Sequence, residues 1–232
     1  MSTYRVQPIP CRCGASFDGE VFESLHVSRR PDVRERILDG TFHRFTCPTC
    51  GQTIVIERRL AYTDFARRQW FTVFPRIDLR HRDEMVAFAR TSFHASMVEH
   101  APELVRGWAA EMTERAVFGL ASLREKLIVL EAGLDDRLLE CLKLQLCRGS
   151  GLVLHPDTFL HVAAVEADTL VFDYGAPGRP PTRLPVPREL YALLGDERER
   201  LRAELPSLFD DIVVDYRSTL APQGALVPAR VA

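Results

Sequence analysis

The spacing of hydrophobic residues changes twice along this 232-residue chain. In residues 1–76, short runs alternate hydrophobic and polar positions between turns rich in Pro, Gly and Cys, which predicts antiparallel strands. In residues 77–149, hydrophobic residues recur every three or four positions, as they do on a helix face. Short β-rich runs return in residues 150–222, before two helical stretches. We therefore expect an α+β fold with a β module, a helical middle region and a small C-terminal β-meander with closing helices.

The individual elements follow from the same pattern. In the first part we expect strands over 4–9, 17–27, 42–45, 52–57 and 70–74, and a short helix over 31–40. Helices in the middle region are expected to begin near residues 82, 102, 120 and 135. In the last part we expect strands over 152–155, 159–165 and 169–174, and helices over 188–194 and 197–205. Residues 211–220 fit a strand or a helix, and residues 223–232 are expected to form a loose tail.

Two short cysteine turns carry the clearest chemical signal. They are Cys11-Arg-Cys13-Gly and Cys47-Pro-Thr-Cys50-Gly, and each has strand-like sequence on both sides. Four thiolates from two turns form the tetrahedral ligand set that Zn²⁺ prefers, and Gly after the second Cys accepts the positive φ of such a turn. Because four protein ligands leave no position open for a substrate, the motif predicts a structural zinc site at Cys11, Cys13, Cys47 and Cys50.

The first turn is one residue shorter than the second, which leaves alternatives open. One of its two cysteines is spare in a second interpretation, and His43 or water then supplies the fourth ligand. The thiols form a redox pair with labile or absent metal in a third interpretation, and they are ordinary buried cysteines in a fourth. The remaining cysteines, Cys141 and Cys147, lie on a helical stretch and are expected to be small buried residues.

Two other sets of polar residues merit attention. Lys126 and Lys143 are the only lysines among 30 Lys and Arg residues, and they fall within one helical stretch. They belong to a polar set that also contains Glu125, Asp135, Asp136, Arg137 and Glu140. This set fits a solvated salt-bridge face, or alternatively a buried ionic cluster or small anion site. Tyr62 and Asp64 fit packing and turn capping, or a recognition surface beside the cysteine module.

The order of several segments resembles the CpXC family of prokaryotic proteins. The segments are Cys11-x-Cys13-Gly-x-x-Phe17, Pro31-Asp-Val-Arg-Glu35, Phe45-Thr-Cys-Pro-Thr-Cys-Gly51, Ala61-Tyr-Thr-Asp64, Leu123-Arg-Glu-Lys126 and Leu134 to Glu140 with Lys143. The likeness runs from about residue 8 to 148, and the first motif departs from the family by lacking Pro and one spacer residue. The resemblance implies a zinc-ribbon-like N-terminal domain and brings no biochemical activity with it.

Composition and charge narrow the function classes. A net charge of -2 gives no general attraction to nucleic acid or anionic membranes, and no run of about 18 apolar residues predicts a spanning helix. Six cysteines without a signal-peptide pattern favour reduced thiols in the cytoplasm. The chain has no phosphate-binding loop, nucleophile elbow or dinucleotide-binding pattern, so we expect no catalytic residues.

These features favour a non-catalytic, zinc-stabilised scaffold or protein-interaction module. Its partner is expected to be another protein or a second copy of the chain, through an arginine-rich face or the leucine-rich helices. An alternative is nucleic-acid binding by the arginine-rich first 75 residues, with Phe42, Trp70 and Phe71 as stacking surfaces. A further alternative is a thiol redox or metal-responsive sensor.

Overall fold

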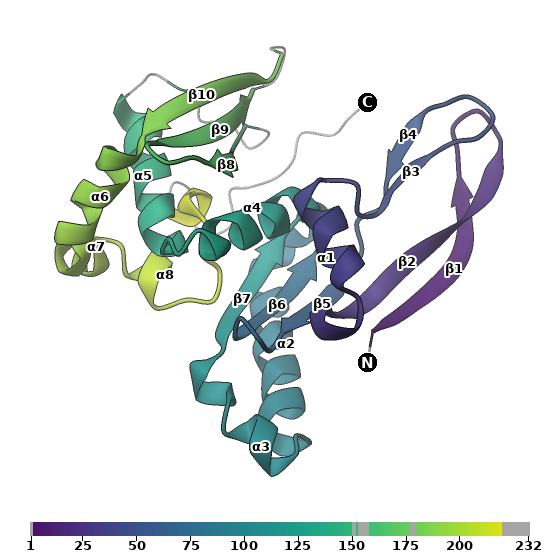
Figure 1. Ribbon diagram of the computed structural model, residues 1–232, viewed down its shortest axis with the longest axis horizontal. Helices are drawn as coiled ribbons and strands as arrows, with labels where there is room; N and C mark the ends of the chain where they lie inside the picture. The colour runs from purple at the N-terminus through teal and green to yellow at the C-terminus, as the bar shows by residue number, and fades with distance from the viewer. Residues whose placement is uncertain (1, 150–151, 153–157, 177–179, 220–232) are drawn as a thin grey trace. The chain divides into compact units, whose positions relative to one another are not determined.

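The chain folds into two compact units (Figure 1). A computed structural model describes residues 2–149, 152, 158–176 and 180–219. Unit 1 is Met1–Leu123 and unit 2 is Arg124–Ala232, so the division falls inside helix α4 (Leu120–Glu131). This division differs from the expected boundaries at residues 76 and 149, because part of the middle region packs on the N-terminal sheet. The fold class is α+β, as the sequence predicted.

Unit 1 is built on a five-stranded mixed sheet with the strand order β1-β2-β5-β6-β7. The strands are β1 (Thr3–Pro10), β2 (Ser16–His26), β5 (Leu60–Asp64), β6 (Gln69–Phe74) and β7 (Thr113–Phe118). Strands β1 and β2 are antiparallel, as are β5 and β6, whereas β2 pairs with β5 and β6 pairs with β7 in parallel. The helices of unit 1 are α1 (Pro31–Leu38), α2 (Arg82–His94) and α3 (Glu103–Arg106).

Strand β7 corrects the sequence prediction of a helical region over residues 77–149. Its last three residues, Ala116, Val117 and Phe118, are all buried, so the strand lacks the alternation that would have revealed it. Its pairing with β6 depends on a partner about 40 positions earlier in the chain. The local pattern therefore could not distinguish this strand from a buried part of a helix.

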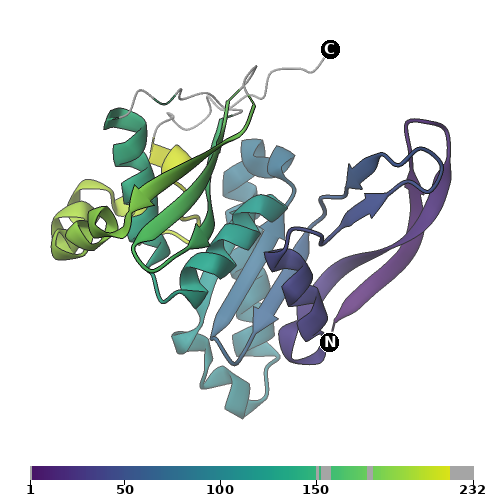
Figure 2. The ribbon, with the colours of Figure 1, turned by 45° about the horizontal axis from the view of Figure 1, so that its top comes forward.

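The two faces of the sheet carry different helices. Tyr62 of β5 lies opposite Phe71 of β6, and both face α1. The alternate residues Trp70 and Phe74 face α2, where Trp70 lies 5.8 Å from Phe93 between ring centres. Figures 1 and 2 show α1 and α2 on opposite sides of the sheet. The main contacts of α2 with the sheet are to β6 and β7.

A second hairpin packs against β2 through a glycine. It consists of β3 (Arg44–Thr46) and β4 (Thr53–Val55), which pair antiparallel. The ring of Phe45 lies so close to Gly19 that a Cβ at position 19 would stand 2.6 Å from a ring carbon. Only glycine allows the two hairpins this approach.

Replacing Gly19 with Ala is expected to destabilise unit 1 by about 1–3 kcal/mol, because Phe45 must move out of its packed position. The free energy of unfolding measured in urea tests this expectation. The matched control is Gly195→Ala in a helix of unit 2, where a Cβ meets no atom within 4 Å. That control should be neutral or stabilising by up to about 1 kcal/mol. Equal effects of the two substitutions would contradict the packing argument.

Unit 2 packs helices against a three-stranded antiparallel sheet with the order β10-β9-β8. Its elements are α5 (Asp136–Gly149), β8 (Phe159–Val165), β9 (Thr169–Gly175), β10 (Thr182–Pro187), α6 (Arg188–Asp196), α7 (Arg198–Glu204) and α8 (Pro206–Phe209). The predicted meander is present, but its third described strand is β10, over residues that the sequence analysis assigned to no element. The strand expected over 152–155 lies mostly outside the described residues.

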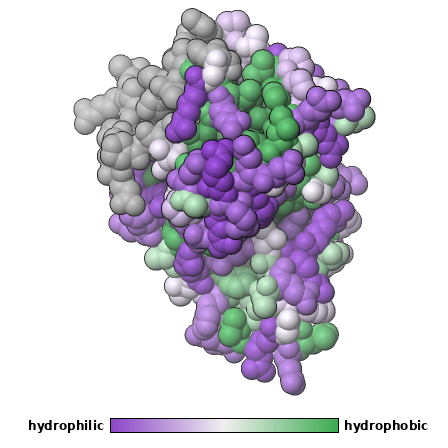
Figure 3. All heavy atoms as spheres, turned by 90° about the vertical axis from the view of Figure 1, so that its left-hand side faces the viewer, coloured by the Kyte–Doolittle hydropathy of each residue, from purple (hydrophilic) through white to green (hydrophobic). Residues whose placement is uncertain are grey.

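The leucines of α5 lie in the core of unit 2. Leu139 and Leu142 are at most 1% exposed and Leu127 of α4 is fully buried, so these leucines do not form the expected interaction surface. Exposed leucines occur instead on α6, at Leu190 and Leu193. On the side that carries α6 and α7, Figure 3 shows patches of hydrophobic residues between hydrophilic ones.

Candidate metal centre

The four N-terminal cysteines lie at the tips of the two hairpins of unit 1. Cys11 and Cys13 occupy the turn between β1 and β2, and Cys47 and Cys50 occupy the turn between β3 and β4. In the first turn the N–H of Gly14 donates to the carbonyl of Cys11 at 3.0 Å. In the second turn, the N–H of the glycine that follows Cys50 donates to the carbonyl of Cys47 at 2.9 Å. The first turn is thus closed by a hydrogen bond between residues three positions apart, and the second by one between residues four positions apart. In both turns the donor is the glycine that follows the second cysteine.

A positive φ closes each turn. Gly14 has φ of 87° and Gly51 has φ of 72°, as expected from the glycine that follows each second cysteine. A β-branched residue at either position would be strained in this conformation. The local sequence therefore sets the geometry of each cysteine pair, and the packing of the hairpins brings the pairs together.

The four sulfur atoms are spaced as ligands of one ion. All four Sγ atoms lie within 4.8 Å of one another, with 3.6 Å between Cys11 and Cys50 and 3.8 Å between Cys13 and Cys47. Thiolates bound at about 2.3 Å around a tetrahedral ion are about 3.8 Å apart, whereas a disulfide requires about 2.05 Å. These cysteines are unbridged and can hold a metal ion together. They are the only such group of three or more Cys, His, Asp or Glu within the described part of the chain.

The protonation of the thiols also favours a bound cation. Burial raises the pKa of Cys47, but N–H groups of Cys50 and Thr49 outweigh it and lower the pKa to about 6. A backbone hydrogen bond from Cys13 lowers the pKa of Cys11, but burial and the neighbouring thiols raise it to about 12. Four adjacent thiols cannot all lose their protons without a positive charge between them. The donor set therefore fits a divalent metal.

His43 does not belong to the sulfur group. Its side chain is fully buried, and its Nε2 atom accepts a hydrogen bond from the N–H of Phe22 at 2.8 Å. Burial lowers the pKa of His43 to about 4, so the ring is neutral at pH 7. The ring stacks on Phe42 with 3.9 Å between centres. His43 thus acts as a core residue, and the four-cysteine set is the one that the structure brings together.

Comparison with known proteins decides the family. Residues 9–143 match the family described as "CpXC protein". The chain belongs to the CpXC family. This CpXC protein is also 23% identical over 213 residues to an "Uncharacterized protein" of Treponema pallidum (strain Nichols), across 90% of this chain and 95% of that protein. No solved structure matches it. The family match includes all four cysteines and ends at Lys143.

The second polar set is a buried ionic cluster in unit 2. Lys143 Nζ lies 2.7 Å from Glu125 Oε2 and 3.0 Å from Glu140 Oε1. Lys126 Nζ lies 3.2 Å from a carboxylate oxygen of Asp136 and 3.2 Å from Glu140. Each of these five residues is at most 4% exposed, so the solvated face that the sequence allowed is wrong.

Backbone groups from distant parts of unit 2 complete the cluster. The N–H of Val162 in β8 donates to Glu125 at 2.6 Å, and the N–H of Tyr216 donates to Glu140 at 3.0 Å. Burial lowers the pKa of Lys143, but Glu125 and Glu140 outweigh it and raise the pKa, so the ammonium stays charged. The cluster therefore joins α4, α5, β8 and the 3-10 turn Tyr216–Thr219. No sequence signal pointed to Val162 or Tyr216, because both contribute main-chain atoms.

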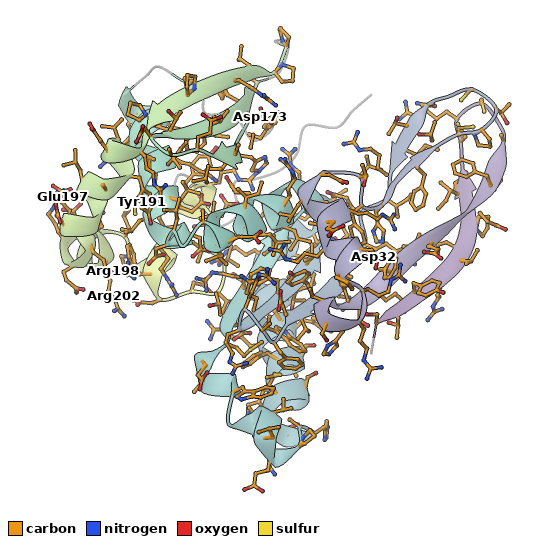
Figure 4. The ribbon with its side chains drawn as sticks, in the orientation of Figure 1. Asp32, Asp173, Tyr191, Glu197, Arg198 and Arg202 are labelled. Carbon is orange, nitrogen blue, oxygen red and sulfur yellow. The ribbon has the colours of Figure 1, made fainter. Side chains whose placement is uncertain are left out.

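Asp135 stands apart from this cluster. Its Oδ1 accepts the N–H of Arg137 at the start of α5, at 2.8 Å, and its carboxylate pairs with Arg198. The hydroxyl of Tyr191 accepts the N–H of Asp135 at 2.7 Å. Figure 4 shows Tyr191 and Arg198 on neighbouring helices of unit 2. Asp135 thus caps α5 and connects it to α6 and α7. It is not part of the buried ionic cluster, although the sequence analysis included it in the polar set.

Tyr62 and Asp64 are buried, which contradicts a recognition surface. Tyr62 is fully buried and stacks on Phe71 with 5.5 Å between ring centres. Asp64 is 2% exposed. Its carboxylate accepts a hydrogen bond from the backbone N–H of Arg67 at 3.2 Å and another from the Nη1 of the same arginine at 3.1 Å. The two residues pack and cap a turn.

The three rings named in the nucleic-acid alternative do not form an exposed stacking surface. Trp70, Phe71 and Phe42 are at most 7% exposed and belong to the core. The described helices also include none that is long and apolar enough to cross a membrane. Neither finding identifies the partner, but base stacking on these three rings is excluded.

Replacing Lys143 with Met is expected to destabilise unit 2 by about 3–5 kcal/mol, because Glu125 remains buried without its counter-charge and Glu140 keeps only its pairing with Lys126. The free energy of unfolding in urea, with hydrogen exchange of α5 as the readout, measures this loss. Arg200→Met is the control, since Arg200 pairs with Glu197 and Glu204 on an exposed surface. It should cost no more than about 1 kcal/mol. Similar losses in both variants would contradict a structural role for the cluster.

Proposed function

We propose that Cys11, Cys13, Cys47 and Cys50 bind one structural zinc ion, and that the protein is a non-catalytic, zinc-stabilised interaction module. The observation that carries this proposal is the set of four Sγ atoms within 4.8 Å at the tips of two hairpins. Four thiolates are typical ligands of structural zinc and complete its coordination sphere, so no position remains for a substrate. The need for reduced thiols suits the cytoplasm, where we place the protein.

The dimensions of the β3–β4 hairpin explain why an ion is needed. Each of its strands has three residues. Only the middle residues, Phe45 and Ile54, are partly buried, and the other residues of both strands are exposed. A hairpin of this size is marginal in water without further support. Zinc binding contributes on the order of 10 kcal/mol in small modules of this kind. The ion would thus hold the β3–β4 tip against the β1–β2 tip.

The outer edge of β1 supports an interaction role. Strand β1 is an edge strand of the described five-stranded sheet, and its side chains Tyr4 and Val6 are 46% and 61% exposed. An open edge with exposed apolar side chains can pair with an extended strand of another protein or of a second copy. Pro8 and Pro10 lack the N–H that such pairing needs, so pairing is limited to the first half of β1.

Purified protein is expected to contain one zinc ion per chain, measured by elemental analysis. Cys47→Ser should lose the ion and unfold the hairpin tips, because three thiolates bind zinc far more weakly than four. Cys141→Ala is the matched control, since this cysteine lies in unit 2 outside the sulfur group. It should keep the full zinc content.

Full zinc content in the Cys47→Ser variant would contradict the assignment. Metal-free protein with six titratable thiols, or with a disulfide between hairpin tips, would favour the thiol-sensor alternative. Hydrogen exchange of the β3–β4 hairpin before and after chelation shows whether the ion stabilises it.

Val6→Lys is expected to abolish retention of the partner, or self-association, while zinc content stays unchanged. A charged side chain on an open strand edge opposes strand addition. The control is Leu193→Lys on α6, because Val6 and Leu193 are both 61% exposed. Cross-linked complexes of the wild-type chain and both variants, together with sedimentation velocity, measure the effect. Loss of association only in the Leu193 variant would move the interface to unit 2.

A further inference from the structure

The four cysteines of the candidate metal centre differ in their access to solvent. Cys13 and Cys50 are exposed, whereas Cys11 is 8% exposed and Cys47 is 1% exposed. Each hairpin tip therefore contributes one exposed and one buried cysteine. Because the oxidation of a thiolate depends on its accessibility, a dissolved oxidant reaches Cys13 and Cys50 first.

The sulfur atoms of opposite hairpins lie close together in pairs. The Sγ atoms of Cys11 and Cys50 are 3.6 Å apart, and those of Cys13 and Cys47 are 3.8 Å apart. Each pair joins the β1–β2 turn to the β3–β4 turn and combines one exposed cysteine with one buried cysteine. Figures 1 and 2 show the two hairpin tips side by side. When the exposed sulfur of a pair is oxidised, a buried sulfur of the other hairpin is thus within reach.

We propose that Cys13 and Cys50 are oxidation sites, and that a peroxide joins the two hairpins through the disulfides Cys11–Cys50 and Cys13–Cys47. The inference rests on the proposed zinc site for the ion that oxidation releases. The pairing itself depends only on the positions of the sulfur atoms. The alternative of one disulfide within each turn would leave the two hairpin tips unconnected.

Each disulfide forms in two balanced steps. The thiolate of the exposed cysteine attacks one oxygen of hydrogen peroxide, so an S–O bond forms, the O–O bond breaks and hydroxide leaves. The thiolate of the buried cysteine then attacks the oxidised sulfur, so an S–S bond forms and the sulfenic oxygen leaves as a second hydroxide. Two electrons pass from the sulfur pair to one peroxide molecule, and both hydroxides take up protons to become water.

The two disulfides replace the ion as the connection between the hairpin tips. A sulfur atom in a disulfide no longer carries the negative charge that binds a divalent metal, so each disulfide removes two of the four ligands. Each cross-link also restricts the unfolded chain, because it closes a loop that contains α1. Oxidation therefore releases the metal while the β3–β4 hairpin stays attached to the β1–β2 hairpin.

The test treats the reduced, zinc-loaded full chain with a small molar excess of hydrogen peroxide. Four of the six thiols should be lost, and the whole zinc content should be released to a colorimetric chelator. The buried thiols of Cys141 and Cys147 should stay reduced. Hydrogen exchange of the β3–β4 hairpin should remain slow in the oxidised, metal-free protein and become fast in reduced protein from which a chelator has removed the ion.

A tryptic digest without reductant identifies the disulfides. Trypsin cleaves after Arg12 and so separates Cys11 from Cys13, whereas Cys47 and Cys50 stay in one peptide. The proposed pairing yields a single assembly of the peptides 6–12, 13–29 and 45–58, in which tandem mass spectrometry assigns both bonds. Disulfides within each turn would instead link 6–12 to 13–29 and leave 45–58 with an internal bond.

Oxidation of the metal-free chain in urea is the control. In an unfolded chain the entropy of loop closure favours neighbouring cysteines, so disulfides within each turn should predominate there. Cross-hairpin disulfides in the native protein alone would show that the fold selects the pairing.

Three results would overturn the inference. They are disulfides within each turn of the native protein, a Cys11–Cys47 bond, and thiols that stay reduced or stop at sulfinic acid without a disulfide. Fast hydrogen exchange of the β3–β4 hairpin after oxidation would also contradict it. Reduced protein that contains no zinc would contradict the proposed function instead, and the peptide map would still decide the pairing of the cysteines.

Discussion

Two parallel strand pairs determine the arrangement of unit 1. Strand β2 pairs in parallel with β5, and β6 pairs in parallel with β7. A parallel pair cannot be closed by a tight turn, so each one needs a long crossover connection. The first connection contains α1 and the β3–β4 hairpin with its cysteines, and the second contains α2 and α3. The second cysteine pair therefore lies in a crossover, whereas Cys11 and Cys13 lie in the hairpin turn between β1 and β2.

The candidate metal centre of unit 1 depends on this arrangement. At the cysteine group, local turn geometry is set by the sequence, and Gly19 allows the two hairpins to approach closely enough for the sulfurs to meet. The cysteine group thus needs both the local turns and the close packing of two hairpins.

Unit 2 depends on buried charge in addition to its leucine core. The cluster of Lys126, Lys143 and three carboxylates lies between α4 and α5 and accepts main-chain hydrogen bonds from β8 and from the turn at Tyr216. Arginine is the usual basic residue of this chain, but its planar group is larger and needs more hydrogen-bond acceptors than the compact ammonium of lysine. Both lysines of the chain lie in this cluster, where their compact ammonium groups fit between the carboxylates.

The sequence by itself determined the features that rest on local chemistry. Glycine after each second cysteine, Pro31 at the start of α1 and the helical spacing in α5 predicted the turns, the helix start and the amphipathic helix where the structure has them. Strand β7 and the burial of the lysine cluster were decided only by the tertiary structure. Each depends on partners distant in sequence: β6 for β7, and Val162 and Tyr216 for the cluster. A local pattern records which side chains are apolar, but whether a polar group meets a partner or water depends on the elements that pack against it.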